Sequence, residues 1–193
     1  MPEFDLPDNF SFTSVGDDGC NPSKWSTDLQ RFLLTIEEKH FVHILDDMFV
    51  IRPVNVELFN ILKEYTKEKD VGEIHVNHAN LRNKKCRFLK EIGGMKIFEL
   101  EQDSPYRAAL QPAIWNKEFM FHCLEPGLSP WAFEERHPKN DGWRIISPDN
   151  KLYPVRKFGG TRRSNINKIK IIEDENKYIL EEDLKELRDR GLL

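Results

Sequence analysis

Long hydrophobic runs and a surplus of basic residues are both missing from this sequence. No apolar stretch approaches the roughly 20 residues that cross a bilayer, so we expect no transmembrane segment. The 29 Lys and Arg residues are outnumbered by 33 Asp and Glu residues, which gives a net charge of −4. Proteins whose main partner is a nucleic acid usually carry a basic excess, so nucleic acid is not the expected partner.

Paired cysteines and a signal peptide are missing as well. The three cysteines, Cys20, Cys86 and Cys123, are odd in number and widely spaced, and they match no zinc-binding pattern. The acidic residues 1–5 show neither the basic nor the apolar part of a signal peptide. We therefore expect free thiols and a cytoplasmic protein.

The sequence does contain what a folded core requires. Its 193 residues are 39% hydrophobic and include 13 Phe and 4 Trp, whereas disordered chains are poor in aromatic residues. This length favours a single domain. We expect a core over residues 1–155, followed by a basic loop, a strand and a C-terminal helix over residues 156–193.

Hydrophobic periodicity predicts an alternation of strands and helices. The predicted strands lie at 10–15, 40–45, 73–77, 96–100, 143–146, 152–155 and 168–172. The predicted helices lie at 26–39, 53–67, 116–124, 129–134 and 180–192. Ser26 is the expected N-cap of the first helix, and Ser129 followed by Pro130 is a typical helix start. The pattern predicts an α/β fold with a mixed central sheet flanked by helices, plus a C-terminal hairpin and helix.

Two acidic residues follow directly after the apolar strand at 40–45. Asp46 and Asp47 stand at its carboxyl end, which is where ligands bind in open α/β sheets. Carboxylate oxygens are the ligands that Mg²⁺ and Mn²⁺ prefer. Successive strand residues point to opposite faces, so both acids can bind one ion only if the strand turns there. The alternative is an ordinary junction between a strand and a loop.

Two further segments carry a family resemblance. Residues 110–118 contain the pattern Leu-Gln-x-x-Ile-Trp, and residues 126–134 contain Ser-Pro-Trp-x-Phe-Glu. Together with the upstream strand that ends in Asp46 and Asp47, these segments resemble a family of bacterial and viral A-type glycosyltransferases. Trp25-Ser26 followed by Leu29 is similar to the stretch before that strand, so the resemblance spans residues 10–135.

The resemblance implies a GT-A-like fold and a metal-dependent transfer reaction. The donor would be a nucleotide sugar, and the acceptor a hydroxyl group of a glycan, polysaccharide or glycolipid. By this resemblance, Asp46 and Asp47 would hold Mn²⁺ or Mg²⁺ together with the donor diphosphate. A divalent cation stabilises the charge that develops on such a leaving group.

The resemblance also implies roles on the acceptor side. Gln111 and Trp115 would line the sugar or acceptor pocket, and Trp131 would stack on a sugar ring. Glu134, or its neighbour Glu135, would act as the general base that takes the proton of the attacking hydroxyl. The structural alternatives are that both tryptophans belong to the core, and that Glu134 complements the dipole of its helix.

Weaker signals come from a histidine and from a basic loop. His75 could approach Asp47 at a metal or contact the substrate, and the alternative is a loop with ordinary surface histidines. His137 could reach the diphosphate. Arg162 and Arg163 could bind donor phosphates through charge-assisted hydrogen bonds, and the alternative is a solvated basic loop.

One departure from the family leaves other functions open. Only 45 residues precede Asp46, where this family usually has a strand–helix–strand unit that binds the nucleotide base. We expect a shortened nucleotide pocket, a truncated form, or a pocket completed by a second chain in a homo-oligomer. The first rival function is a non-catalytic, glycosyltransferase-derived module that binds carbohydrate or protein. The second is a metal-dependent phosphate-ester hydrolase.

Overall fold

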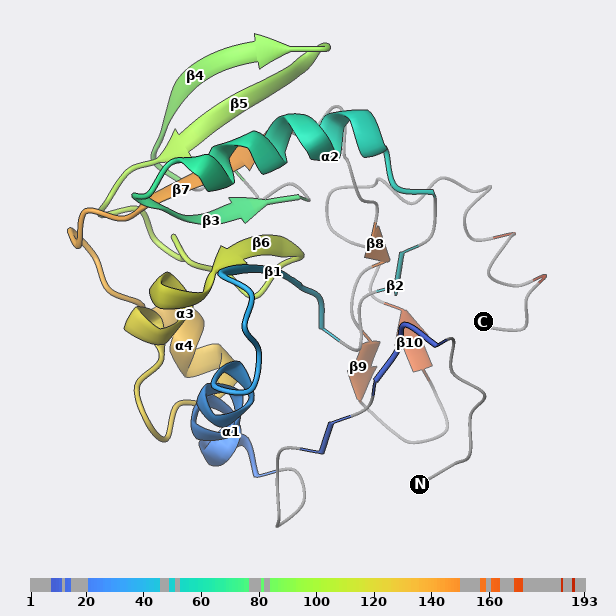
Figure 1. Cartoon of the computed structure of the whole chain (residues 1–193), viewed down its shortest axis with the longest axis vertical. Helices are drawn as coiled ribbons and strands as arrows, with labels where there is room; N and C mark the ends of the chain where they lie inside the picture. Colours follow the sequence, from blue (N-terminus) through green and yellow to red (C-terminus); the bar gives the residue numbers. More distant parts are fainter. Residues whose placement is uncertain are drawn as a thin grey trace.

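The computed structural model places ten strands and six helical segments in the described part of the chain (Figure 1). The structure describes residues 8–11, 13–14, 21–45, 49–50, 53–76, 81, 84–149, 157–158, 161–163, 169–171, 185 and 189. The helical segments are η1 (Pro22–Lys24), α1 (Trp25–Leu33), α2 (Val56–Lys63), η2 (Glu64–Lys67), α3 (Lys117–Cys123) and α4 (Pro130–Arg136). The strands are β1 (His40–His43), β2 (Phe49–Val50), β3 (Val71–His75), β4 (Cys86–Ile92), β5 (Met95–Leu100), β6 (Ala113–Asn116), β7 (Arg144–Pro148), β8 (Lys157–Phe158), β9 (Thr161–Arg163) and β10 (Ile169–Ile171).

Six of these strands form one mixed sheet. Their order is β1-β6-β3-β7-β5-β4. β3 and β7 are parallel, and the other neighbouring pairs are antiparallel. Two separate two-stranded ladders join β2 with β8 and β9 with β10. The predicted α/β class, with a mixed sheet flanked by helices in a single domain, is confirmed.

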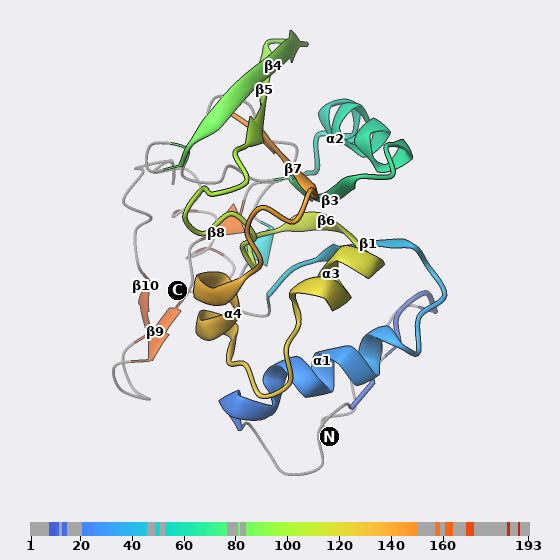
Figure 2. The ribbon, with the colours of Figure 1, turned by 90° about the vertical axis from the view of Figure 1, so that its left-hand side faces the viewer.

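Helices cover the two faces of the sheet unequally. α2 lies on one face, whereas α1, α3 and α4 lie on the other (Figures 1 and 2). Leu58 and Leu62 of α2 are buried against Ile74 and Ile114 of the sheet. The residues at these positions alternate along each strand with residues that face the other helices, so both faces of β3 and β6 are buried.

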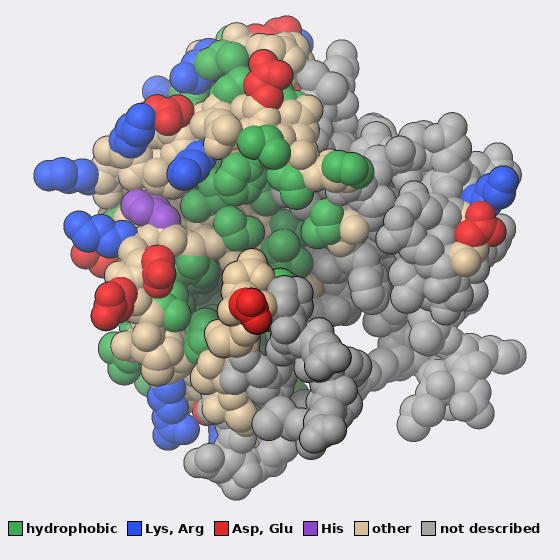
Figure 3. Space-filling view, turned by 45° about the vertical axis from the view of Figure 1, so that its right-hand side comes forward, with side chains coloured by type: hydrophobic (Ala, Val, Ile, Leu, Met, Phe, Trp, Pro, Cys, Tyr) green, Lys and Arg blue, Asp and Glu red, His purple; other side chains and the backbone are tan. Residues whose placement is uncertain are grey.

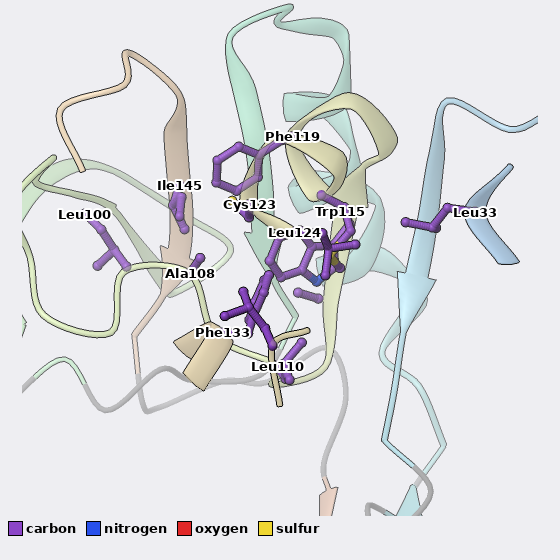
Figure 4. Packing of buried hydrophobic residues seen from close by; sticks show 13 residues of the cluster. Leu33, Leu100, Ala108, Leu110, Trp115, Phe119, Cys123, Leu124, Phe133 and Ile145 are labelled. Atoms are coloured by element: carbon purple, nitrogen blue, oxygen red, sulfur yellow. The ribbon is translucent and has the colours of Figure 1, made fainter. Parts of the chain in front are cut away.

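The core beneath α3 and α4 is built around aromatic rings. Trp115 of β6 stacks on Phe119 of α3 at a centroid distance of 5.7 Å, and it contacts Phe133 of α4 at 6.0 Å (Figure 4). All three side chains are fully buried. Gly72 of β3 passes so close to this cluster that an added Cβ would lie 2.3 Å from Cγ of Phe119. The sheet and α3 can approach this closely only because residue 72 has no side chain.

The start of the chain departs from two predictions. The described residues between 10 and 14 form no strand, and they are exposed, so their alternation matches no buried face. Ser26 is not the N-cap of α1: it is fully buried, and its Oγ accepts a hydrogen bond from Leu128 N–H at 2.8 Å. The helix continues from η1 and begins one residue earlier, at Trp25. It also ends at Leu33 and not near residue 39; the carbonyl oxygen of Lys39 accepts a hydrogen bond from the N–H of Lys117, the first residue of α3.

Most of the remaining elements agree with the periodicity. The predicted helix at 53–67 corresponds to α2 and η2, and the predicted strands at 73–77 and 96–100 correspond to β3 and β5. Ser129 caps α4 as expected, since its Oγ accepts the N–H of Ala132 at 3.2 Å. β4 was not predicted, because it is an edge strand whose charged side chains interrupt the alternation of apolar and polar residues.

The described residues cover only parts of the predicted C-terminal elements. The predicted strand at 168–172 is confirmed as β10. The predicted strand at 152–155 lies outside the described residues. Within the predicted helix at 180–192, only Lys185 and Asp189 are described, and both are helical.

One edge of the sheet is left open to solvent on the α2 face. Hydrophobic side chains gather in the middle of the face seen in Figure 3. Val42 of β1 and Ile44 just after it are 47% and 40% exposed. Because Val42 pairs with the buried Ile114 on the α2 side of the sheet, the cover provided by α2 ends before β1. Within the described residues, no helix has both the length and the apolar character needed to cross a membrane.

Candidate functional site

The candidate site lies at the end of the sheet where β1 and β3 finish and β6 begins. Ala113 of β6 pairs with His43 of β1 on one side and with His75 of β3 on the other. Residues directly opposite one another in an antiparallel pair share a face, so these three residues form a row that faces α3 and α4. The chain leaves β1 here towards residues 46 and 47 and enters β6 here from Gln111.

Glu134 of α4 is tied to the segment that enters β6. Its Oε1 accepts a hydrogen bond from the backbone N–H of Leu110 at 2.8 Å. The Glu134 side chain is half-buried, whereas Glu135 is exposed. The hydrogen bond from the Leu110 N–H orients the carboxylate group, which can accept hydrogen bonds at both oxygens. Of the two predicted bases, the structure therefore brings Glu134 to the site.

His137, at the end of α4, connects Glu134 to another loop. Its Nδ1 lies 2.8 Å from the carbonyl oxygen of Glu134, and its Nε2 lies 3.1 Å from the backbone N of Arg107. The carbonyl can only accept and the N–H can only donate, so the network assigns the proton to Nδ1 of a neutral ring. Burial lowers the pKa of His137, in agreement with a neutral imidazole.

A lysine lies within electrostatic reach of two carboxylates. Lys84 Nζ donates a hydrogen bond to the carbonyl oxygen of Tyr106 at 2.6 Å. Burial lowers the pKa of Lys84, and the negative charges of Glu73 and Glu134 oppose that effect. Lys84 therefore places a positive charge near both carboxylates.

Arg107 fixes the loop that precedes Gln111. Its guanidinium is fully buried and pairs with Asp141 Oδ1 at 2.6 Å. It also donates to the carbonyl oxygens of Gln102, Pro138 and Trp143. Five fixed donors make Arg suited to joining several acceptors in one place. The residue therefore has a structural role next to the candidate site.

His75 lies deeper than expected from the sequence. It is fully buried beside Glu73, with Nε2 at 2.9 Å from Glu73 Oε1, so the expectation of a surface histidine is wrong. The contact has the distance but not the alignment of a hydrogen bond, and neither side chain hydrogen-bonds to another described residue. A buried polar pair of this kind lowers stability. The Glu73–His75 pair lies on the same face of the sheet as Trp115, which belongs to the neighbouring strand β6.

The other predicted site residues are distributed between the site, the core and the undescribed segments. Trp115 packs in the core and presents no face to a sugar, whereas Trp131 is 68% exposed on the first turn of α4. Gln111 is half-buried at the entry to β6. Asp46 and Asp47 lie outside the described residues. Arg162 and Arg163 belong to β9, and their side chains are not described.

Three residues around the candidate site were not predicted from the sequence. Glu73 is hidden within an apolar strand, Lys84 lies in a polar loop, and Tyr106 carries no motif. The signal that could have drawn attention to this region is Arg107, a charge that directly precedes the apolar run 108–110.

Comparisons with known proteins add no family to this description. No family model, no curated protein and no solved structure matches the chain. Within the described segments, no group of three or more His, Cys, Asp or Glu side chains is arranged to bind a metal ion.

Proposed function

We propose that the chain is a metal-dependent glycosyltransferase that moves a sugar from a nucleoside-diphosphate donor to a hydroxyl group of a glycan, polysaccharide or glycolipid. The observation that carries the proposal is the meeting of three motif segments at one end of the sheet. β1 leads there into Asp46, Gln111 comes two residues before the β6 residue paired with β1, and Glu134 bonds to Leu110. This end of an open α/β sheet is where ligands bind.

In the proposed reaction, Glu134 takes the proton of the acceptor hydroxyl. The hydroxyl oxygen forms a bond to the anomeric carbon, and the bond from that carbon to the phosphate oxygen breaks. The Leu110 N–H orients the carboxylate, and the positive charge of Lys84 lies within electrostatic range of it. Mn²⁺ or Mg²⁺ on Asp46 and Asp47 would neutralise the departing diphosphate, and two carboxylates are a suitable donor set.

The test is sugar transfer from a panel of UDP-, GDP- and dTDP-sugars in Mn²⁺. Release of nucleoside diphosphate and formation of glycoside are both measured. Glu134→Gln keeps the shape of the side chain but removes the base, so we expect turnover to fall by about 10²- to 10⁴-fold. Glu135→Gln is the matched control, since this exposed neighbour lies on the same helix, and it should keep turnover near the wild-type level.

Several outcomes would overturn the proposal. Full activity in EDTA, retained in Asp47→Ala, would end the metal role. A loss of turnover in Glu135→Gln but not in Glu134→Gln would remove the base assigned above. Release of free phosphate, with no sugar transferred, would favour a metal-dependent phosphate-ester hydrolase.

A second candidate function is a binding module without turnover. The 68% exposure of Trp131 favours it, because an exposed aromatic ring can bind a sugar without any turnover. Such a module would bind carbohydrate or a partner protein but would show no metal-dependent binding of nucleoside diphosphate. Titration calorimetry with UDP, GDP and dTDP, with and without Mn²⁺, separates the two candidates.

A further inference from the structure

Tyr106 has a backbone conformation that a tyrosine rarely adopts. Its φ is 48°, in the left-handed region, where Cβ crowds the backbone. Asn140 is the other described non-glycine residue with positive φ, and asparagine tolerates this region well. A bulky residue in such a conformation persists only when the surrounding structure imposes it. A functional contribution of the Tyr106 ring would offset the strain of this backbone conformation.

The peptide unit after Tyr106 is held on both sides by side chains. Its carbonyl oxygen accepts a hydrogen bond from Lys84 Nζ at 2.6 Å. Its N–H, that of Arg107, is directed at His137 Nε2 at 3.1 Å. Two side chains from different parts of the chain thus fix one peptide group, and this accounts for the left-handed residue before it.

Both groups that hold this peptide also interact with Glu134. His137 Nδ1 donates to the Glu134 carbonyl oxygen at 2.8 Å, and the Lys84 ammonium interacts electrostatically with the Glu134 carboxylate. Only one imidazole ring therefore separates the backbone of Tyr106-Arg107 from that of Glu134. The Glu134 carboxylate itself binds the N–H of Leu110, four residues after Tyr106 in the same segment.

The ring of Tyr106 is turned to solvent in this position. It is 53% exposed, although nearby Arg107 and His137 are buried. Trp131 is 68% exposed and lies three residues before Glu134, on the same side of α4. Large exposed aromatic rings near a half-buried carboxylate are well suited to the apolar C–H faces of sugar rings.

We propose that Tyr106 is an acceptor-binding residue whose ring, with that of Trp131, forms the stacking platform for the acceptor sugar beside Glu134. This inference rests on the proposed function and assigns a residue to its acceptor side. The left-handed backbone holds the ring at the rim of the site. Neither the sequence motifs nor the expected pocket residues include Tyr106.

The experiment uses the full chain and glycine substitutions at the two described non-glycine positions with positive φ. Tyr106→Gly removes the ring. Asn140→Gly is the matched control, because Asn140 lies outside the peptide group that Lys84 and His137 hold. The probes are the methyl β-glycosides of glucose, galactose, mannose and N-acetylglucosamine, observed by saturation-transfer NMR. Tyr106→Phe retains a ring and should retain binding. Melting temperatures are measured for each variant.

The expected result is a loss of function without a loss of stability. Tyr106→Gly should melt at or above the wild-type temperature, because the left-handed strain is relieved, while its glycoside affinity falls by about two- to tenfold, the range that one aromatic contact supplies. Asn140→Gly should bind as the wild type does. Unchanged glycoside binding in Tyr106→Gly would overturn the inference, and so would a wild-type protein that binds none of the four probes.

Failure of the inference differs from failure of the proposed function. If the wild type transfers sugar and Tyr106→Gly keeps the same KM for the acceptor, the inference falls and the glycosyltransferase proposal stands. If the wild type binds the glycosides through Tyr106 but transfers nothing, the platform stands and the chain is a carbohydrate-binding module.

Discussion

His43 makes the stability of this protein sensitive to mild acid. The residue ends β1 in the row with Ala113 and His75, and its Nδ1 is buried without a hydrogen-bond partner among the described residues. Burial lowers the pKa of His43 from 6.5 to about 4. Protonating this ring is therefore less favourable in the folded state than in the unfolded chain.

The sign and size of the effect follow from proton linkage. The folded pKa is depressed, so the unfolded state binds more protons between pH 6.5 and 4, and stability falls as the pH falls through this range. Each pKa unit corresponds to about 1.4 kcal/mol, so lowering the pH from 7 to 5 should cost at most about 2 kcal/mol through His43. His40 and His137 have lowered pKa values as well and act in the same direction.

Urea unfolding at pH 7, 6 and 5 measures this contribution. His43→Phe and His43→Gln pack differently but share the loss of the titrating ring, so both should lose the same part of the pH dependence. Relative to the wild type, each variant should gain up to about 2 kcal/mol between pH 7 and pH 5. If both variants keep the wild-type slope, the buried imidazole is not the source of the acid sensitivity, and the reasoning is refuted.

Two further predictions concern packing around the site. Gly72→Ala should destabilise the fold by about 1–3 kcal/mol or more, because the new methyl group meets the Phe119 ring, and the double variant with Phe119→Leu should cost less than the sum of the single changes in urea unfolding. Additive costs would contradict this. Arg107→Met should cost about 3–5 kcal/mol, since it leaves Asp141 buried without its cation, and adding Asp141→Leu should recover part of the loss. Equal stability of the single and double variants would argue against the ion pair.

The sequence by itself determined the local elements of this protein. β5 and α3 lie within one residue of their predicted bounds, and α4 begins after the predicted cap, because alternation, helical spacing and a Ser-Pro start act over a few residues. The position of Glu134 on the first turns of a helix was predictable for the same reason. A site shared with Asp46 is implied only by the resemblance, because Asp46 lies outside the described residues.

Tertiary structure alone decided which of these residues meet and which are buried. Trp115 and Trp131 stand in equivalent-looking motifs, but β6 lies between two strands and buries the first, while the first turn of α4 exposes the second. The partner of Glu134 is Leu110, and the left-handed conformation of Tyr106 depends on Lys84 and His137. These contacts join residues more than 20 positions apart, so no local pattern encodes them, and only the folded chain brings them together.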